Sequence, residues 1–477
     1  MREPAAAIPA PLFPPWPGAL ARARAALSLA ARALGVTQLG VLAWLALRSA
    51  FSPRERALGL AARALGRLKG PYAKLGQLAA VRVDVLAPEA RAALLALRDD
   101  VPPLPAAWIR TCVERELGAP LEQRFARFDA RPLGAASIAQ VHGARLPDGR
   151  EVAVKVQYPW LARTVRIDLA LARVALRLVV GVAVDDAAWR EFARGFASEL
   201  DFAREAESAR TIAANLRSEP SVAVPRVVAE ASSARVLTAE RVATLPIARA
   251  ALLARGVAPA AVLEIVVRAY ARQVFLDGVF HADPHAGNLF VIDEPSAAAK
   301  PRVLFVDFGL SQRLTPELHR ELRAGILALL NDRLDDFIAG MQRMAMIAPG
   351  AEPGVRAAVG AMFARLRGER AGALAVSGER VLALKDEAQA LLFATPGLAL
   401  PADLLLYAKT VTYLFALGRE LAPEVDVMKL AAPYLLRFVA AREPGDGGAP
   451  KSTKPSEWGG GQPRRARRAA GRGPADR

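Results

Sequence analysis

The chain has 477 residues, 53% of them hydrophobic and 23% charged, so it can bury a large core and is not a disordered protein. Its single cysteine, Cys112, excludes an intramolecular disulfide and a cysteine-built zinc site, which fits a reducing, cytoplasmic location. Four histidines leave little room for a histidine-rich metal centre. Residues 1–18 contain prolines where a signal peptide needs a continuous apolar run, so we do not expect secretion.

The formal net charge of +17 is concentrated at the two ends of the chain. Residues 1–74 carry eleven Lys and Arg against two acidic residues, and residues 451–477 carry eight against two. A nearly neutral middle with basic ends argues against a basic groove across the fold. It favours contact of the ends with an anionic surface, either lipid headgroups or nucleic acid.

The sequence favours peripheral contact with the inner face of a membrane over a spanning helix. The charge-free runs at residues 33–47 and 388–402 have fifteen residues each, whereas a bilayer crossing needs roughly 20. The Ala/Leu/Arg-rich N-terminal segment is only partly amphipathic, so two interpretations of it carry equal weight. It is either a helix on an anionic membrane or a helix packed on the protein with a solvated arginine face.

Composition and periodicity divide the chain into five segments. They are a basic Ala/Leu/Arg-rich segment at 1–60, a helical extension at 61–130, a small β-rich region at 131–242, a larger helical region at 243–442 and a disordered basic tail at 443–477. This order of elements predicts an α+β fold.

Short β-like runs fill the 131–242 region. Ser137–Leu146 and Glu151–Gln157 predict two strands joined by the turn Pro147-Asp148-Gly149. A long helical stretch follows, and Pro225–Glu230 and Arg235–Arg241 then predict two more strands.

The 243–442 region is mostly helical in pattern. We expect a loop near His281–Asn288 and an apolar strand at Val303–Val306. A helix should start at Thr315-Pro316-Glu317, where threonine can cap the helix and proline fits its first position.

The densest chemical signal is the segment His281–Asn288, His-Ala-Asp-Pro-His-Ala-Gly-Asn, which is followed by Asp307-Phe-Gly. Asp283 and Asn288 have the spacing of a kinase catalytic loop, and the later triplet matches the kinase metal-binding motif. Phosphoryl transfer needs such oxygen ligands, because Mg²⁺ bridges the phosphates and offsets the charge that develops on them. We therefore expect Asp307 and Asn288 to hold Mg²⁺, and Asp283 to orient or deprotonate the attacking hydroxyl or water.

A metal centre of His281, Asp283 and His285 is the competing interpretation of the same segment. On a strand the three side chains would share one face, but Pro284 argues against a strand. The chain also has no further histidine cluster to complete such a site. Together with the downstream Asp-Phe-Gly, the segment favours phosphoryl transfer.

Val152-Ala-Val-Lys155 matches the kinase strand whose lysine binds the α- and β-phosphates of ATP. The partner of this lysine should be a glutamate on the following helix. Asp201 and Glu205 are four residues apart and share a helical face, whereas Glu199 points elsewhere, so we expect Glu205 to pair with the lysine. Glu240 ends the last predicted strand, where a kinase hinge would hold adenine, and a solvated strand end is an equal alternative.

The predicted phosphate loop lacks the usual Gly-x-Gly-x-x-Gly pattern. It contains Ala135, Ala136 and Ser137 instead. Because alanine restricts φ where glycine does not, the backbone over the nucleotide should be stiffer than in a conventional kinase.

Taken in order, these motifs resemble the UbiB/AarF family of atypical, protein-kinase-like proteins linked to ubiquinone biosynthesis. The resemblance spans about residues 70–315, and the residues that carry it are Lys74-Leu-Gly-Gln77 (the family's Lys-x-Gly-Gln motif), the Ala135-Ala136-Ser137 loop, Val152–Gln157, Glu199-Leu-Asp201-Phe with Glu205, His281–Asn288 and Asp307–Gly309. It implies a two-lobed protein-kinase-like fold, with a small β-rich N-lobe, a larger helical C-lobe and a helical N-terminal extension folded over the active site. It also places Lys74 and Gln77 over the nucleotide cleft, near Glu199 and Asp201.

The resemblance further implies binding of ATP and Mg²⁺, ATPase rather than protein-kinase activity, and a membrane-linked role with an isoprenoid or quinone-type lipid or its biosynthetic enzymes. Nucleic acid is not an expected partner. Only five residues, Leu310–Leu314, lie between the Asp307-Phe-Gly motif and the predicted helix start at Thr315. An ordinary kinase activation segment, on which a peptide substrate docks, does not fit in this length. Two alternatives are a small-molecule kinase, which the Lys-x-Gly-Gln motif and alanine loop disfavour, and a nucleotide-binding scaffold, which the full set of catalytic-type residues disfavours.

Overall fold

The structure is a computed structural model that describes residues 39–41, 68–74, 103–175, 177, 186–293, 300–370, 391, 394–398 and 400–441. The predicted basic tail, nearly all of the N-terminal segment 1–60, and Gln77 lie outside the described residues. Apart from the last residue of the final helix, every element below belongs to one compact unit, Met1–Val439.

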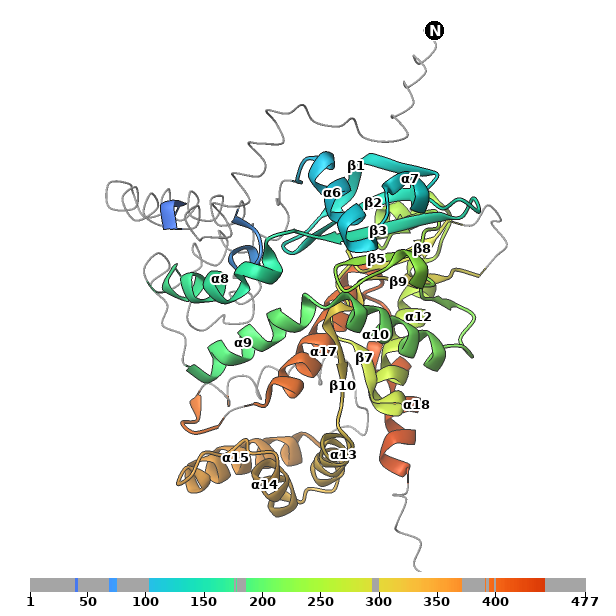
Figure 1. The fold of residues 1–477 in the computed structure, drawn as a ribbon. Helices are drawn as coiled ribbons and strands as arrows, with labels where there is room; N and C mark the ends of the chain where they lie inside the picture. The colour runs from blue at the N-terminus through green and yellow to red at the C-terminus, as the bar shows by residue number, and fades with distance from the viewer. Residues whose placement is uncertain are drawn as a thin grey trace, which may run out of the picture. The chain divides into compact units, whose positions relative to one another are not determined.

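The small lobe is built on a four-stranded antiparallel sheet in the order β1-β2-β3-β5 (Figure 1). Its strands are β1 (Arg127–Ala135), β2 (Ala139–Arg145), β3 (Glu151–Gln157) and β5 (Val236–Glu240). The turn between β2 and β3 is the predicted one, with Gly149 at φ +91°. The strands predicted at 137–146, 151–157 and 235–241 are therefore present, the first of them beginning two residues later than expected.

Helices cover the two faces of this sheet. Helices α6 (Ala106–Leu117) and α7 (Leu121–Arg124) pack against the valine side chains of β3 in one apolar cluster. The predicted helical stretch is divided into α8 (Leu161–Ala175), α9 (Asp186–Glu199) and α10 (Phe202–Asn215). Side chains of all three helices join the apolar cluster on the opposite face of the sheet. Because side chains alternate along a strand, Lys155 points away from the valine face.

The strand predicted at 225–230 is wrong. The structure has a two-residue strand, β4 (Val222–Ala223), and a 3₁₀ turn, η3 (Ala229–Ala231). Between them, Val227 forms one isolated bridge with Ala239 of β5. The backbone N–H of Val228 still donates to Thr238 of β5 at 2.8 Å. Its carbonyl then accepts bonds within the η3 turn, so local turn bonds replace a continuous ladder.

The larger lobe is centred on α12 (Pro259–Arg272), whose buried side chains share one core cluster with the last two helices. The helical elements are α11 (Arg249–Ala254), α12, the π-helical turn η4 (Gln273–Asp277), α13 (Pro316–Leu330), α14 (Leu334–Arg343), α15 (Glu352–Arg370), α17 (Ala402–Leu421) and α18 (Val427–Ala440). The predicted helix start at 315 is confirmed, because Thr315 Oγ1 accepts from Leu318 N at 3.2 Å. Within the described part of the chain, none of the helices combines the length and apolar character that crossing a bilayer requires.

Short strands in the larger lobe frame the segments that carry the chemical motifs. One sheet has the order β4-β9-β8-β6 and a second pairs β10 with β7. Their bounds are β6 (Thr244–Pro246), β7 (Val279–His281), β8 (Leu289–Ile292), β9 (Val303–Phe305) and β10 (Ser311–Arg313). The loop 282–288 connects β7 to β8, and β9, the strand predicted at 303–306, leads directly to Asp307. The larger lobe is therefore less purely helical than the sequence suggested.

Candidate active site

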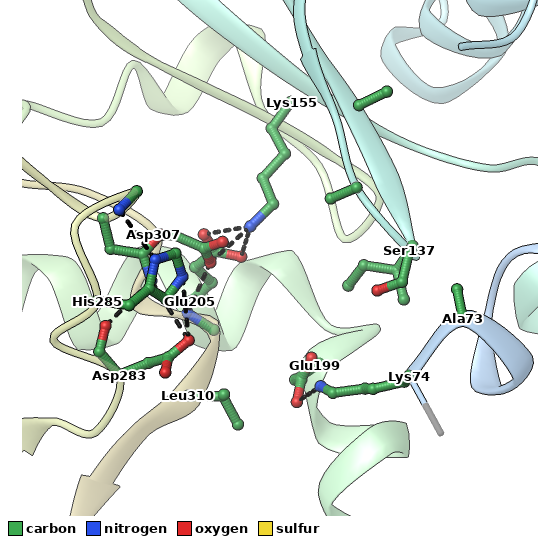
Figure 2. Close-up of a pocket in the computed structure, with 16 residues that line it drawn as sticks. Ala73, Lys74, Ser137, Lys155, Glu199, Glu205, Asp283, His285, Asp307 and Leu310 are labelled. Carbon is green, nitrogen blue, oxygen red and sulfur yellow. Dashed lines mark hydrogen bonds and ion pairs between the residues drawn. The ribbon is translucent and has the colours of Figure 1, made fainter. Parts of the chain in front are cut away.

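A cavity of about 330 Å³ brings together most of the predicted site residues (Figure 2). Its walls come from the 68–74 segment, the β1–β2 loop, β3, α9, α10, the loop after β7 and the turn after β9. The residues that line it are Ala73, Lys74, Ala135, Ala136, Ser137, Ile138, Lys155, Glu199, Glu205, Asp283, His285, Gly287, Asn288, Asp307, Gly309 and Leu310.

Two predicted site residues lie elsewhere. Asp201 caps α10, and its Oδ1 accepts from two backbone N–H groups of the first turn at 3.0 and 3.3 Å. Glu240 is at the end of β5, where its Oε1 lies 2.6 Å from Nη2 of Arg226. Neither side chain lines the cavity. Asp201 contributes indirectly, because it starts the helix that carries Glu205.

Lys155 is the centre of a three-residue contact (Figure 2). Its Nζ lies 2.8 and 2.9 Å from the two carboxylate oxygens of Glu205 and 2.9 Å from Oδ1 of Asp307. The Glu205 side chain is 3% exposed, whereas that of Asp307 is 47% exposed. The structure thus contains the expected lysine–glutamate pair and adds the aspartate of the Asp-Phe-Gly motif to it.

One ammonium group is therefore shared by two carboxylates. Burial raises the pKa of Glu205 to about 7 even though Lys155 lowers it, and Asp307 adds to the increase. Burial alone would lower the pKa of Lys155, but Asp307 and Glu205 outweigh it and raise that pKa. For Asp307 burial acts to raise the pKa, and Lys155 outweighs it and holds the pKa well below the ordinary value. Lys155 and Asp307 are both charged at neutral pH.

Asp307 has a strained backbone. Its φ of +61° lies in the left-handed region that non-glycine residues rarely adopt, and its Oδ1 accepts from Gly309 N at 3.4 Å. Strain of this kind costs about 1–3 kcal/mol and persists where the surroundings hold it, typically at functional sites. The conformation points the carboxylate toward Lys155 at the end of β9.

His281 links the catalytic-type loop to the Asp-Phe-Gly turn. Its Nε2 lies 3.0 Å from the Val306 carbonyl, so this nitrogen carries the proton, and its Nδ1 accepts from the Tyr270 hydroxyl at 3.0 Å. Burial lowers the pKa of His281, which keeps the ring neutral. Both ring nitrogens are therefore occupied, and no cluster of three or more His, Cys, Asp or Glu side chains suited to a metal exists in the described part of the chain. The alternative metal centre at His281, Asp283 and His285 is wrong.

Asp283 has its carboxylate held by three side chains. Its Oδ1 accepts from Lys409 Nζ at 2.9 Å, and its Oδ2 lies 3.4 Å from Nε2 of His285 and 3.5 Å from Nδ2 of Asn288. Asn288 also donates to the Asp283 carbonyl at 3.2 Å, which fixes the two predicted residues relative to each other. Burial would raise the pKa of Asp283, but Lys409 and His285 outweigh it and hold the pKa below its ordinary value.

Sequence reasoning missed Lys409 and assigned His285 only to the alternative metal centre. Lys409 is 126 residues from Asp283 in the chain and belongs to α17, so no local spacing connects the two. The only signal was a lone lysine between apolar residues on the helix, Leu-Tyr-Ala-Lys-Thr-Val. His285 was considered only as a metal ligand, although its place between Asp283 and Asn288 was visible.

The extension supplies one wall of the cavity through Ala73 and Lys74. Lys74 forms a buried ion pair with Glu199, at the end of α9 (Figure 2). Burial, together with the nearby ammonium of Lys409, lowers the pKa of Lys74 to about 7. The structure therefore places Lys74 at the cavity beside Glu199, as the family resemblance implied.

Backbone and side-chain contacts fix this segment to the small lobe. Gly70 N donates to the Ser137 carbonyl at 2.7 Å, which joins the extension to the alanine loop. Lys69 Nζ donates to the Tyr158 hydroxyl at 3.1 Å, and that hydroxyl donates to the Ala136 carbonyl at 3.0 Å. Gly70 has φ +61°, a conformation that favours glycine, and a Cβ there would also lie 2.6 Å from Cδ2 of Leu161.

These elements define a two-lobed, protein-kinase-like fold. A strand lysine pairs with a helical glutamate in the small lobe, and it faces an Asp–Asn loop and an Asp-Phe-Gly turn in the larger one. An ABC1 atypical kinase-like domain matches residues 96–338. The chain belongs to this family, and the resemblance to UbiB proteins is confirmed by its relatives.

Two relatives carry the description "Probable protein kinase UbiB". The chain is 33% identical over 424 residues to the protein of Xanthomonas campestris pv. campestris (strain B100), covering 84% of this chain and 74% of the relative. It is 31% identical over 436 residues to that of Aeromonas salmonicida (strain A449), covering 89% and 74%. Among solved structures, the Rv3197–erythromycin complex from Mycobacterium tuberculosis is similar with a TM-score of 0.43 and 24% identity, covering 75% of this chain and 93% of that chain.

Proposed function

We propose that this protein binds MgATP in the cavity and acts as an ATP-dependent atypical kinase or ATPase. The contact among Lys155, Glu205 and Asp307 carries the proposal. Kinase-like proteins hold phosphates with such a lysine, fix the lysine with a helical glutamate, and hold the metal with such an aspartate. Lys155 would exchange Asp307 for the phosphates of the nucleotide while Glu205 keeps its ammonium in place.

The residues present fit magnesium. Asp307 is ionised and half-exposed to the cavity, and Asn288 uses its amide nitrogen toward Asp283, which leaves the amide oxygen for another partner. Carboxylate and amide oxygens are the ligands that Mg²⁺ prefers. Asp307 and Asn288 would therefore hold Mg²⁺, which offsets the charge that develops on a transferred phosphoryl group. Asp283 would orient the attacking hydroxyl or water.

The region after the Asp-Phe-Gly motif supports hydrolysis or a small acceptor over a peptide. Only η5 (Phe308–Leu310) and β10 separate Asp307 from the helix α13. Strand β10 is paired with β7, with Ser311 opposite His281, so this short segment is held in a sheet. Ala73 and Lys74 of the extension line the cavity on another side. A peptide has no activation segment to dock on, and we propose slow ATP turnover without general protein-kinase activity.

Nucleotide-dependent thermal stabilisation tests the proposal. A ligand that binds only the native state stabilises it by RT ln(1 + [L]/Kd), about 2.7 kcal/mol at 100 times Kd. Lys155→Ala and Asp307→Asn should lose most of the MgATP-dependent rise in Tm, whereas the control Lys429→Ala, at an exposed lysine of α18, should keep it. ATP with a chelator in place of magnesium should give a smaller rise than MgATP. Wild-type responses in both site variants would refute the assignment, and vigorous peptide phosphorylation would refute the proposed activity.

We further propose that the acceptor or partner is an isoprenoid or quinone-type lipid, or an enzyme that makes one, reached at the inner face of a membrane. The support is the description of the relatives as UbiB proteins together with the basic N-terminal segment. Deleting the gene in its host and profiling quinones and isoprenoid lipids by mass spectrometry tests the first part. Flotation with anionic liposomes at low and high salt tests the second, and absence of binding at both salt levels would remove membrane contact from the proposal.

A further inference from the structure

We infer that Lys409 is a positioning residue for catalysis, which holds the Asp283 carboxylate so that one of its oxygens faces the attacking group. The inference rests on the proposed function, since it assigns a role within the same site. It extends the site to α17, more than a hundred residues beyond the catalytic-type loop.

The contact is direct and largely buried. Lys409 Nζ lies 2.9 Å from Asp283 Oδ1, with 22% of the lysine side chain and 10% of the aspartate side chain exposed. The same ammonium lies 5.5 Å from the centroid of the Tyr413 ring, one helical turn further along α17. Lys409 does not line the cavity, so its contact with the site is made through Asp283.

Packing fixes the helix that carries this lysine. Leu406 and Tyr407 pack against the cluster that contains Phe280 and Ala282, immediately before Asp283. The following turns of α17 enter the main core with Leu414, Phe415, Leu417 and Leu421. Lys409 therefore extends from a rigid helix to the loop that carries Asp283, and a rigid support of this kind holds a catalytic side chain in place.

The catalytic-type loop itself supplies no ammonium or guanidinium group to Asp283. Between Asp283 and Asn288 the residues are Pro-His-Ala-Gly, of which His285 is the only one with a titratable side chain. Lys74, which also faces this region, forms its ion pair with Glu199. His281 and Tyr270 are hydrogen-bonded to each other. A carboxylate this deeply buried needs a cationic partner, and Lys409 provides it.

The two oxygens of Asp283 are held unequally. Oδ1 has a charge-assisted bond of 2.9 Å from Lys409, whereas the contacts of Oδ2 with His285 and Asn288 are 3.4 and 3.5 Å. The short bond fixes the plane of the carboxylate. Oδ2, with the weaker contacts, is the oxygen available to accept a hydrogen bond from the attacking hydroxyl or water.

Steady-state ATP hydrolysis by purified full-length variants tests this role. Lys409→Met should lower kcat by roughly 10- to 100-fold, equal to about 1.4–2.8 kcal/mol of activation free energy, with little change in KM for MgATP. Lys409→Arg, which keeps the cation, should retain most of the turnover. The matched control Lys429→Met removes an exposed lysine of α18 and should behave as wild type. If Lys409→Met does not fold, Lys409→Gln replaces it in every comparison.

The double variant separates positioning from direct phosphate binding. In an Asp283→Asn background, Lys409→Met should cause no further fall in kcat, because the lysine acts through the aspartate. An unchanged kcat in the single Lys409→Met variant, a rise in KM alone, or an independent additional loss in the double variant would overturn the inference while leaving the proposed function intact. A wild-type protein that neither binds nor hydrolyses MgATP would overturn the proposed function, and the inference with it.

Discussion

Replacing Glu205 with glutamine should make the protein more stable at pH 7.5 and less responsive to nucleotide. Glu205 is almost fully buried, and it shares one ammonium with Asp307. Two carboxylates around one lysine leave a surplus negative charge, and Glu205 is the carboxylate that is shielded from solvent. Glutamine has nearly the same shape and carries no charge, so Glu205→Gln removes that surplus while keeping an oxygen that can accept from Lys155.

The size of the effect follows from the pKa of Glu205, which is about 7 in the folded protein against an ordinary value of 4.5. Between these two pH values the folded chain binds a proton that the unfolded chain has released, so stability is lost as the pH rises through 7. At about 1.4 kcal/mol for each pH unit, ionised Glu205 lowers the free energy of unfolding by up to about 3 kcal/mol at pH 7.5. Glu205→Gln should raise Tm by several degrees there.

Thermal melts at several pH values, with and without MgATP, check both halves of the prediction. The gain in Tm should fade as the pH falls from 7 to 4.5, and the control Glu207→Gln, at an exposed position of α10, should show no such gain. Lys155 in the variant is held by Asp307 more than by residue 205, so nucleotide should bind more weakly. A tenfold weaker Kd reduces the stabilisation from about 2.7 to about 1.4 kcal/mol at 100 times the wild-type Kd. A lower Tm at pH 7.5, with the pH dependence of the wild type, would refute the reasoning.

Two further predictions concern the extension and the core of the small lobe. Lys74→Ala leaves the buried Glu199 without its partner, so it should lower Tm by a few degrees. Because Lys74 lines the cavity in which we propose that MgATP binds, the variant should also change the MgATP response, and an unchanged response would contradict a role of the extension in nucleotide binding. His142 is buried, with its Nδ1 2.8 Å from the Asp129 carbonyl, and burial lowers its pKa below the ordinary value of 6.5. As the pH falls below 6.5, the unfolded chain therefore binds a proton at this residue before the folded chain does, and the free energy of unfolding decreases. Urea unfolding at pH 7 and pH 5 should show a larger loss for wild type than for His142→Gln, and equal losses would exclude His142 as the cause.

Local patterns predicted the elements that carry the small-lobe site. The Val-Ala-Val-Lys pattern identified Lys155, and a four-residue spacing from Asp201, the residue that caps α10, selected Glu205. The Thr315 cap was equally local, because a capping side chain and a proline define a helix start without tertiary contacts. These signals depend on neighbours within one turn or one strand, and such signals are readable in a sequence.

Contacts between distant segments were not readable. Lys409 reaches Asp283 only because α17 packs on the core of the larger lobe, and nothing near either residue specifies that packing. The strands β7 and β10 have three residues each, too few to show an alternating pattern inside a helical region. The sequence analysis places Asp201 within a continuous helix, whereas its side chain caps the start of α10. An aspartate directly before a helical run is also typical of such a cap.

Charge pairing explains why metal and nucleotide should enter the site together. Each carboxylate at the cavity is contacted by a lysine from another part of the fold, and the contacts are Lys74 with Glu199, Lys155 with Glu205 and Asp307, and Lys409 with Asp283. Phosphate groups arriving alone would draw Lys155 away from Asp307 and leave that carboxylate facing them, an unfavourable meeting of like charges. On the proposed assignment, Mg²⁺ held by Asp307 would supply the positive charge that Lys155 withdraws, so the exchange should be favourable for the metal–nucleotide complex and not for the nucleotide alone.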